Sequence, residues 1–331
     1  MIDISFIIPV YKTPEPLLRA CLASVCSVRA MGIEIICIVD SPGAECERVL
    51  AEIAGRDSRI RILRNDINRG AAYSRNRGID AACGEFISFV DSDDTIVPQV
   101  YEEILRVSKE RDLSACSCKA EGVRKHCGVE YGGWGFDRGP CIHAFQMGAW
   151  AALWRSTCIK SNSIRFPEDL RHNEDFVFVT RFLQLGLPIG FYNKKGYNYI
   201  NNPKSVTHSA ASSRLILDQA RSSHYILEAL GPVKLSKDDA RWYAKRIAWN
   251  LFGDWRINRI LLDEERRIYV ELLSQILPQY QAGLGFALLS LENFLLGRMS
   301  KHPKRILSCR FLYYWPFRIL MQIKSLLKKE D

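Results

Sequence analysis

An apolar run between Gly84 and Asp94 ends in three closely spaced carboxylates. Phe86–Val90 contains no charged residue, which is typical of a strand covered on both faces of a parallel sheet. Such sheets bind ligands beyond the carboxyl ends of their strands. In extended backbone, Asp91 and Asp93 would point to the same side and could share one divalent cation with a bound diphosphate. The stretch therefore predicts a cation site at the edge of a sheet.

A simpler interpretation is that the same acidic residues cap the next helix. Asp and Ser are favourable N-cap residues, and Val97–Arg111 has the pattern of a helix. A lone Asp-x-Asp is also common by chance, so the upstream residues must decide between the two interpretations.

Three strand–helix units precede this stretch. Strands are expected at Ile4–Val10, Ile33–Val39 and Ile60–Leu63, each followed by a helical pattern. Thr13 would cap the first helix. Together with a fourth strand ending at Asp91, these units predict an α/β, doubly wound, mostly parallel sheet flanked by helices.

The chain lacks the common glycine-rich nucleotide motifs. It has no Gly-x-Gly-x-x-Gly after the first strand and no Gly-x-x-x-x-Gly-Lys, so neither a dinucleotide fold nor a P-loop is supported. Asp40 and Asp91, at two strand ends, suit a base or ribose better than phosphates, which they would repel without a metal.

Four ordered motifs run from the first strand to the acidic stretch. They are Ile7–Tyr11, Glu34–Asp40, Asn68–Ile79 (with Gly70, Ser74, Arg75, Asn76 and Gly78) and Gly84–Asp94. In this order they resemble the family 2 glycosyltransferases with a GT-A fold, which pass a sugar from a nucleotide diphosphate to an acceptor hydroxyl. The resemblance implies a GT-A catalytic domain over residues 1–210, with a nucleotide-sugar half (1–115) and an acceptor half (116–210). A helical C-terminal region would follow over residues 211–331.

The resemblance also implies roles for individual residues on the donor side. The nucleotide sugar would be bound by Pro9, Tyr11, Asp40, Arg75, Asp91 and Ser92. Asp93, in a DXD motif, would hold Mg²⁺ or Mn²⁺, and His208 is a second candidate for contact with the metal or diphosphate. For Pro9 and Tyr11, packing at the strand end is an alternative role. The chain has Val39–Pro42 where the family commonly reads Asp-Asp-Gly-Ser.

The acceptor side begins at His172–Asp175, which opens a helix running to Leu185. Carboxylates at a helix N-terminus are favoured by its dipole, so capping is an alternative explanation. The Glu-Asp pair matches the family's catalytic motif. The resemblance implies that Asp175 is the general base, that Glu174 orients the acceptor or the loop, and that transfer inverts the anomeric carbon. The donor would be a UDP-sugar and the acceptor a glycan or a lipid-linked glycan of surface-polysaccharide synthesis.

The segment from Cys116 to Phe145 has weak periodicity and predicts irregular structure around the mouth of the site. Cys116, Cys118, His126 and Cys127 lack the paired spacing of structural zinc modules.

The composition indicates a globular chain. Of 331 residues, 47% are hydrophobic and 25% are charged, as in ordinary globular proteins. The eleven cysteines fit a reducing compartment. The first apolar run begins at Ile4 without the features of a secretory signal, so we expect a cytoplasmic protein.

The net charge of +9 is concentrated near the C-terminus, where residues 298–331 hold nine Lys or Arg against two acidic residues. The last segment mixes the aromatic and aliphatic residues of Phe311–Met321 with Arg310, Arg318, Lys324, Lys328 and Lys329. This mixture predicts peripheral contact with an anionic membrane through residues 298–329, on the cytoplasmic face of the inner membrane. A solvated basic helix or a dimer contact are the alternatives. The apolar Gly283–Leu296 is too short to span a bilayer. No element suggests nucleic-acid binding.

Two other functions remain open from the sequence. A catalytically silent carbohydrate-binding or scaffold protein could keep the same fold, but it would have no use for Asp91, Asp93 and Asp175. A sugar-phosphate nucleotidyltransferase also places a nucleotide on an α/β sheet, but no basic, glycine-rich triphosphate loop is present.

Overall fold

The computed structural model describes residues 2–29, 32–40, 45–121, 134–138, 148–200 and 213–231, with single residues and pairs between 239 and 272. The chain divides into two units, Met1–Ala210 and Ala211–Asp331. His208, the remainder of the 116–145 segment and residues 298–329 lie outside the described residues.

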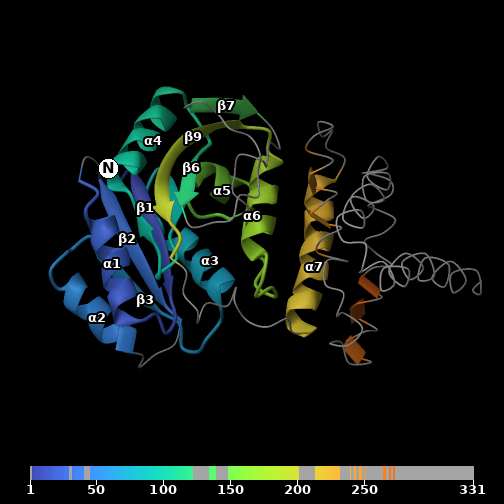
Figure 1. The fold of residues 1–331 in the computed structure, drawn as a ribbon, viewed down its shortest axis with the longest axis horizontal. Coiled ribbons are helices and arrows are strands. Elements are labelled where there is room, and N and C mark those ends of the chain that lie inside the picture. Colours follow the sequence, from blue (N-terminus) through green and yellow to red (C-terminus); the bar gives the residue numbers. More distant parts are fainter. Residues whose placement is uncertain are drawn as a thin grey trace, which may run out of the picture. The chain divides into compact units, whose positions relative to one another are not determined.

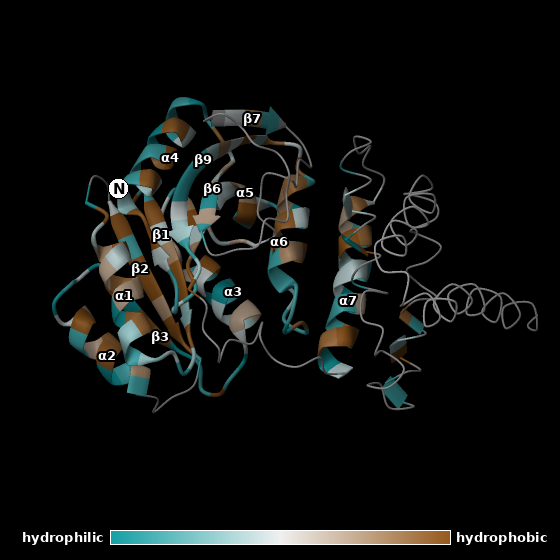
Figure 2. Cartoon of the chain, in the orientation of Figure 1, coloured by the Kyte–Doolittle hydropathy of each residue, from teal (hydrophilic) through white to brown (hydrophobic). Residues whose placement is uncertain are grey.

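The first unit begins with four parallel strands joined by helices (Figure 1). The elements are β1 (Ile4–Val10), α1 (Glu15–Cys26), β2 (Ile33–Val39), α2 (Glu45–Ala54), β3 (Ile60–Arg64), α3 (Ala71–Ala81) and β4 (Phe86–Phe89). They pair in the order β3-β2-β1-β4, which places β1 and β2 inside the sheet. All seven residues of β2 are buried, and both strands are mostly hydrophobic (Figure 2). The predicted doubly wound half-domain is confirmed.

The second half of the unit extends the same sheet. Its elements are β5 (Thr95–Ile96), α4 (Pro98–Glu110), β6 (Ala115–Glu121), β7 (Trp134–Arg138), β8 (Ala152–Arg155), α5 (Ser156–Ser161), α6 (Glu174–Leu183) and β9 (Pro188–Asn198). The order continues from β4 as β8-β6-β9-β5, and β7 also pairs with β9. Because β8 runs antiparallel to both of its neighbours, the sheet is mixed beyond β4.

Two expectations for local structure were wrong. The 116–145 segment is not irregular throughout, because it contains most of β6 and all of β7. The small, buried residues of β6 (Ala-Cys-Ser-Cys) pair with both β8 and β9 but lack the branched apolar residues that mark a strand in a sequence. Thr13 does not cap α1, whose N-cap is Pro14; its hydroxyl lies 2.6 Å from that of Ser92 instead.

The acidic stretch does not cap α4 either. The N-cap of α4 is Val97, with no side-chain cap, and the short strand β5 separates Asp94 from the helix. The carboxylates are therefore not accounted for by helix capping.

In the second unit, α7 (Ser213–Leu230) is an amphipathic helix, as its mixed colouring shows (Figure 2). It lies at the start of the region, residues 211–331, where helices were expected. Among the helices of the described part of the chain, none combines the length and the apolar character needed to cross a bilayer.

The helix α3 lies very close to β1. A Cβ atom added at Gly78 would lie 2.4 Å from Cγ2 of Ile7, a buried residue in the centre of β1. The absence of a side chain at Gly78 therefore sets how near the helix comes to the sheet.

We expect Gly78→Ala to destabilise the protein by about 1–3 kcal/mol, the usual cost of overpacking, because this outweighs the roughly 1 kcal/mol that alanine gains in a helix. Urea denaturation would measure the change. Gly55→Ala is the matched control, since its Cβ would lie no nearer than 3.4 Å to its neighbours. Equal stability of the two variants would show that α3 can move away without cost.

Candidate active site

The strands β1, β2 and β4 end side by side at one edge of the sheet. The amide of Asp40 donates to the carbonyl of Val10 (2.9 Å), and the amide of Val90 donates to the carbonyl of Ile7 (3.0 Å). Tyr11, Asp40 and Asp91, which follow these strands, are thereby brought to the same edge. Tyr11 is exposed, whereas Pro9 is half-buried within β1.

The carboxylate of Asp40 organises the loop that leads into α3. It accepts hydrogen bonds from Asn65 Nδ2 (2.7 Å) and from the amides of Arg69 (2.8 Å) and Gly70 (2.7 Å). Gly70 begins α3 with φ +94°, which non-glycine residues rarely adopt. Asp40 is only 3% exposed, so it holds this loop in place, a structural role that the sequence does not reveal.

The acidic stretch forms a turn rather than the end of a strand. The amide of Asp94 donates to the carbonyl of Asp91 (3.0 Å), because the chain must reverse after β4 ends at Phe89. The expectation that Asp91 and Asp93 share one side of extended backbone is therefore wrong. The Asp91 side chain is 30% exposed and Asp93 is half-buried. Both carboxylates lie on the turn beyond the strand end.

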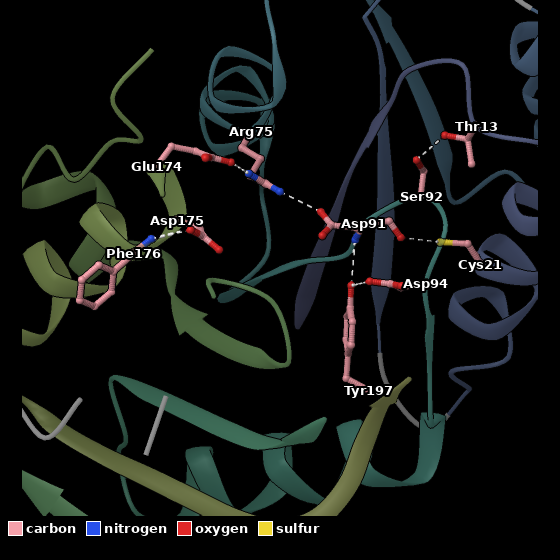
Figure 3. A network of polar contacts seen from close by, with 10 residues as sticks. All are labelled: Thr13, Cys21, Arg75, Asp91, Ser92, Asp94, Glu174, Asp175, Phe176 and Tyr197. Carbon is pink, nitrogen blue, oxygen red and sulfur yellow. Dashed lines mark hydrogen bonds and ion pairs between the residues drawn. The ribbon is translucent and has the colours of Figure 1, made fainter. Parts of the chain in front are cut away.

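The third carboxylate of the stretch, Asp94, is fixed from β9. It accepts hydrogen bonds from the hydroxyl of Tyr197 (2.8 Å) and the amide of Ile200 (2.8 Å). The same hydroxyl accepts a hydrogen bond from the amide of Asp91 (3.1 Å), so Tyr197 joins both ends of the turn (Figure 3). Burial, and then the charge of Asp91, raise the pKa of Asp94 to about 8. Because Asp94 accepts the bonds from Tyr197 and Ile200, it shapes the turn.

The side chain of Arg75 reaches from α3 to carboxylates on two other segments. Its Nη2 lies 2.8 Å from Asp91 Oδ1, and its Nη1 lies 2.8 Å from Glu174 Oε1 (Figure 3). Burial disfavours the charge on Arg75, but the nearby carboxylates of Asp91 and Glu174 outweigh burial and raise its pKa. The donor-side turn and the first turn of α6 thus meet at one guanidinium.

Asp175 lies in that first turn of α6, beside Glu174. Its Oδ1 accepts a hydrogen bond from the amide of Phe176 (2.7 Å), and Asn173, the N-cap, has the left-handed φ of 64°. Burial, and then the charge of Glu174, raise the pKa of Asp175 to about 7, although the charge of Arg75 opposes the shift. A carboxylate with this pKa can exchange a proton near neutral pH.

Residues 5–136 match the family described as glycosyl transferase family 2. The chain carries a glycosyltransferase family 2 domain. The predicted family is thereby confirmed, and the exposed Tyr11, the turn at Asp91 and Arg75 all lie within the matched region.

Relatives of this glycosyltransferase include bacterial proteins of the same kind. It is 31% identical over 208 residues to EpsH of Bacillus subtilis, named as a putative glycosyltransferase, covering 59% of this chain and 60% of EpsH. It is 28% identical over 240 residues to YibD of Escherichia coli, named as an uncharacterized glycosyltransferase, covering 67% of this chain and 68% of YibD. A third relative is the succinoglycan biosynthesis protein ExoO of Rhizobium meliloti, at 24% identity over 255 residues, covering 69% of this chain and 70% of ExoO.

Solved structures show the same fold. The TarS fragment 1–349 of S. aureus in complex with UDP-GlcNAc superposes with a TM-score of 0.69 at 19% identity, covering 91% of this chain and 92% of that one. The mannosyltransferase PcManGT of Pyrobaculum calidifontis, in complex with GDP-Man and Mn²⁺, has a TM-score of 0.54 at 12% identity, covering 87% of this chain and 80% of that one. The glycosyltransferase thus has the predicted GT-A fold.

The carboxylates suit a hard divalent cation but do not enclose one. Within the part of the chain that the structure describes, no three His, Cys, Asp or Glu side chains come together as a metal site. Asp93 and Asp91 offer oxygen atoms, which Mg²⁺ and Mn²⁺ prefer, and such ions commonly complete their shell with substrate phosphates and water. The carboxylate oxygens of Asp91 and Asp93 therefore fit a cation that would be held jointly by the protein and a diphosphate.

Several residues that shape the site could not be found from the sequence. Tyr197 lies on β9, and its bond to Asp94 joins residues 103 positions apart. Asn76 belongs to the motif Asn68–Ile79, but the sequence does not predict its partner. Its side chain bonds both the amide and the carbonyl of Phe166 (3.0 and 2.9 Å). Trp150 stacks on Tyr197 with ring centroids 5.2 Å apart.

Proposed function

We propose that this glycosyltransferase moves a sugar from a UDP-sugar to a hydroxyl of a glycan or lipid-linked glycan, with inversion and with the help of Mg²⁺ or Mn²⁺. The observation that carries the proposal is the meeting of the Asp91 turn with Glu174, the residue before Asp175, at the buried guanidinium of Arg75. Donor-side and base-side carboxylates, distant in the chain, are thereby joined in one network. The retained carboxylates favour an enzyme over a silent scaffold.

On the donor side, the proposal assigns the nucleoside to the edge where β1, β2 and β4 end. The exposed ring of Tyr11 offers an apolar face, and Pro9, Asp40 and Ser92 would complete the pocket. The uncommitted part of the Asp91 carboxylate, on a side chain that is 30% exposed, suits a ribose hydroxyl. UDP is favoured because the fold is shared with TarS, which was solved with UDP-GlcNAc.

On the acceptor side, Asp175 would take the proton of the attacking hydroxyl. The acceptor oxygen then forms a bond to the anomeric carbon while the bond from that carbon to the diphosphate oxygen breaks, and UDP leaves with the electron pair. A bound Mg²⁺ or Mn²⁺ would neutralise the charge on the departing diphosphate, with Asp93 as its protein ligand. Glu174, held by Arg75, would orient the first turn of α6. Attack opposite to the leaving group gives inversion.

Release of the nucleoside diphosphate, UDP or GDP, from a panel of UDP- and GDP-sugars, with Mg²⁺, Mn²⁺ or EDTA, tests the proposal. Slow hydrolysis of the donor reports even without the acceptor. We expect turnover of one UDP-sugar that EDTA abolishes. A folded protein that neither binds nor turns over any nucleotide sugar would refute the proposal and favour the silent scaffold.

We also propose that the protein works at the cytoplasmic face of a membrane, in surface-polysaccharide synthesis. The support is the cluster of cations and aromatic residues at 298–329 and the name of the relative ExoO, a succinoglycan biosynthesis protein. Sedimentation of the full chain with anionic vesicles, compared with neutral vesicles, tests the membrane contact.

The raised pKa of Asp175 predicts an acidic limit to the reaction. Because a general base must be deprotonated, kcat/KM should fall about tenfold for each pH unit below a pKa of about 7. Arg75, Glu174 and Asp91 are the charged groups that act on Asp175. Initial rates of UDP release between pH 5 and 9 would measure this limb. A limb near pH 4, where an ordinary carboxyl titrates, would contradict the prediction.

A further inference from the structure

Arg75 is placed to connect elements rather than to face a ligand. The residue is only 6% exposed, and its two Nη atoms point to Asp91 and Glu174, which lie 16 and 99 positions away in the sequence. A guanidinium can bond two carboxylates at once because its donors form a rigid, planar fork. The contacts therefore fix both carboxylates relative to α3.

The guanidinium keeps this position at a cost. Its Nε is buried and has no hydrogen-bond partner among the described residues. A buried donor without a partner is unfavourable, so the orientation of the side chain is set by the two charge-assisted bonds at its other nitrogen atoms. The position of Arg75 thus serves Asp91 and Glu174.

The next residue of α3 strengthens the same connection. The side chain of Asn76 bonds both the amide and the carbonyl of Phe166. The ring of Phe166 stacks on that of Phe178 in α6, with 4.2 Å between the centroids. The guanidinium of Arg75 lies 5.3 Å from the centroid of the Phe166 ring. Two consecutive residues of α3 therefore hold α6. Arg75 holds its first turn through Glu174, and Asn76 holds Phe166, whose ring stacks on Phe178.

We propose that Arg75 is a positioning residue that locks the first turn of α6, and with it Asp175, to the turn that carries Asp91. The inference rests on the proposed function, because the role of Asp175 as the base belongs to it. Glu174 is the link: Arg75 holds its carboxylate, and Asp175 is the next residue on the helix. Arg75 acts on the rate through this geometry and makes little direct contribution to nucleotide binding.

Arg75→Lys tests the inference, because an ammonium keeps the charge but cannot make both planar contacts. We expect kcat to fall roughly 100-fold, as for a base displaced by about 1 Å. The dissociation constant for UDP, measured by calorimetry, should change by less than about 3-fold. A tenfold weaker affinity for UDP with kcat unchanged would overturn the inference and assign Arg75 to nucleotide binding.

Arg61→Lys is the matched control. Arg61 also bonds a largely buried glutamate, since its Nη1 lies 2.8 Å from Glu34 Oε2, but this pair lies near the amino ends of β2 and β3, away from the site. We expect its kcat to match that of the wild-type protein. A comparable loss of kcat in Arg61→Lys would show that the effect of Arg75→Lys is general and would also overturn the inference.

A double-mutant cycle identifies the link itself. If Arg75 acts through Glu174, the variant that combines Arg75→Lys with Glu174→Gln should lose no more kcat than the more damaged single variant. Single losses that multiply in the double variant would overturn the link.

The same cycle in urea denaturation separates this inference from the proposed function. We expect the two substitutions to shift the midpoint non-additively, and this measurement requires no substrate. If the wild-type protein turned over no nucleotide sugar, the proposed function would fail, while additive midpoint shifts would overturn the link between α3 and α6.

Discussion

Asp175→Asn should lower kcat for sugar transfer by about 10²–10⁴-fold, the usual contribution of a general base. An acceptor hydroxyl is a poor nucleophile until its proton is removed, and an amide cannot accept that proton. The substitution should leave the fold intact, because the asparagine Oδ1 can still accept the hydrogen bond from the amide of Phe176. The loss should therefore fall on kcat, with the affinity for UDP nearly unchanged.

The measurement is UDP release at pH 8, where the wild-type carboxyl is mostly ionised, together with calorimetry of UDP binding. Asp112→Asn is the control, since Asp112 is an exposed carboxylate that pairs with Arg155 outside the site. If Asp175→Asn kept more than half of the wild-type kcat, Asp175 would not be the base, and Glu174 would be the next residue to test.

The order of elements up to β4 follows from local sequence pattern. Ile33–Val39 is apolar at all but one position and is buried at all seven, so its place inside a sheet can be read directly. The strand β6 could not be read in this way. Its small residues become a strand because β8 and β9 offer hydrogen bonds on either side, which is information outside the segment.

The motif in α3 shows what a sequence reveals of a site. Its residue types were recognised, but each acts through a distant partner: Ser74 accepts a bond from Asn65, Asn76 bonds Phe166, and Gly78 gives room to Ile7. A motif indicates that these types are needed in this order. The folded chain supplies the reason for each.

The acidic turn shows the opposite limit. Alternation along a strand placed Asp91 and Asp93 on one side, but the backbone there is governed by Tyr197, whose hydroxyl bonds both the amide of Asp91 and the carboxylate of Asp94. A contact across about a hundred residues leaves no local signature. The sequence pattern therefore identifies the residues of this turn but does not predict its geometry.

Asp93→Ala should lower donor turnover by about 10²–10³-fold, corresponding to the loss of several kcal/mol of charge stabilisation at the leaving diphosphate. The reason is the small number of protein ligands. Since the described residues form no cluster of three metal-ligating side chains, a cation held jointly with the diphosphate would lose a large share of its protein contacts with one carboxylate. The backbone bond between Asp94 and Asp91 does not involve the Asp93 side chain, so the turn should persist.

Titration of Mn²⁺ against UDP release would show the effect, with the remaining activity of Asp93→Ala no longer responding to the cation. Asp80→Ala is the control, because it removes an exposed aspartate on α3 that pairs with Arg165. Asp93→Ala could still saturate at the same Mn²⁺ concentration as the wild-type protein, while Asp91→Ala no longer responded to Mn²⁺. That pair of results would assign the role of metal ligand to Asp91. Asp91 also bonds Arg75, so the cation would then share the Asp91 carboxylate with the guanidinium that holds Glu174.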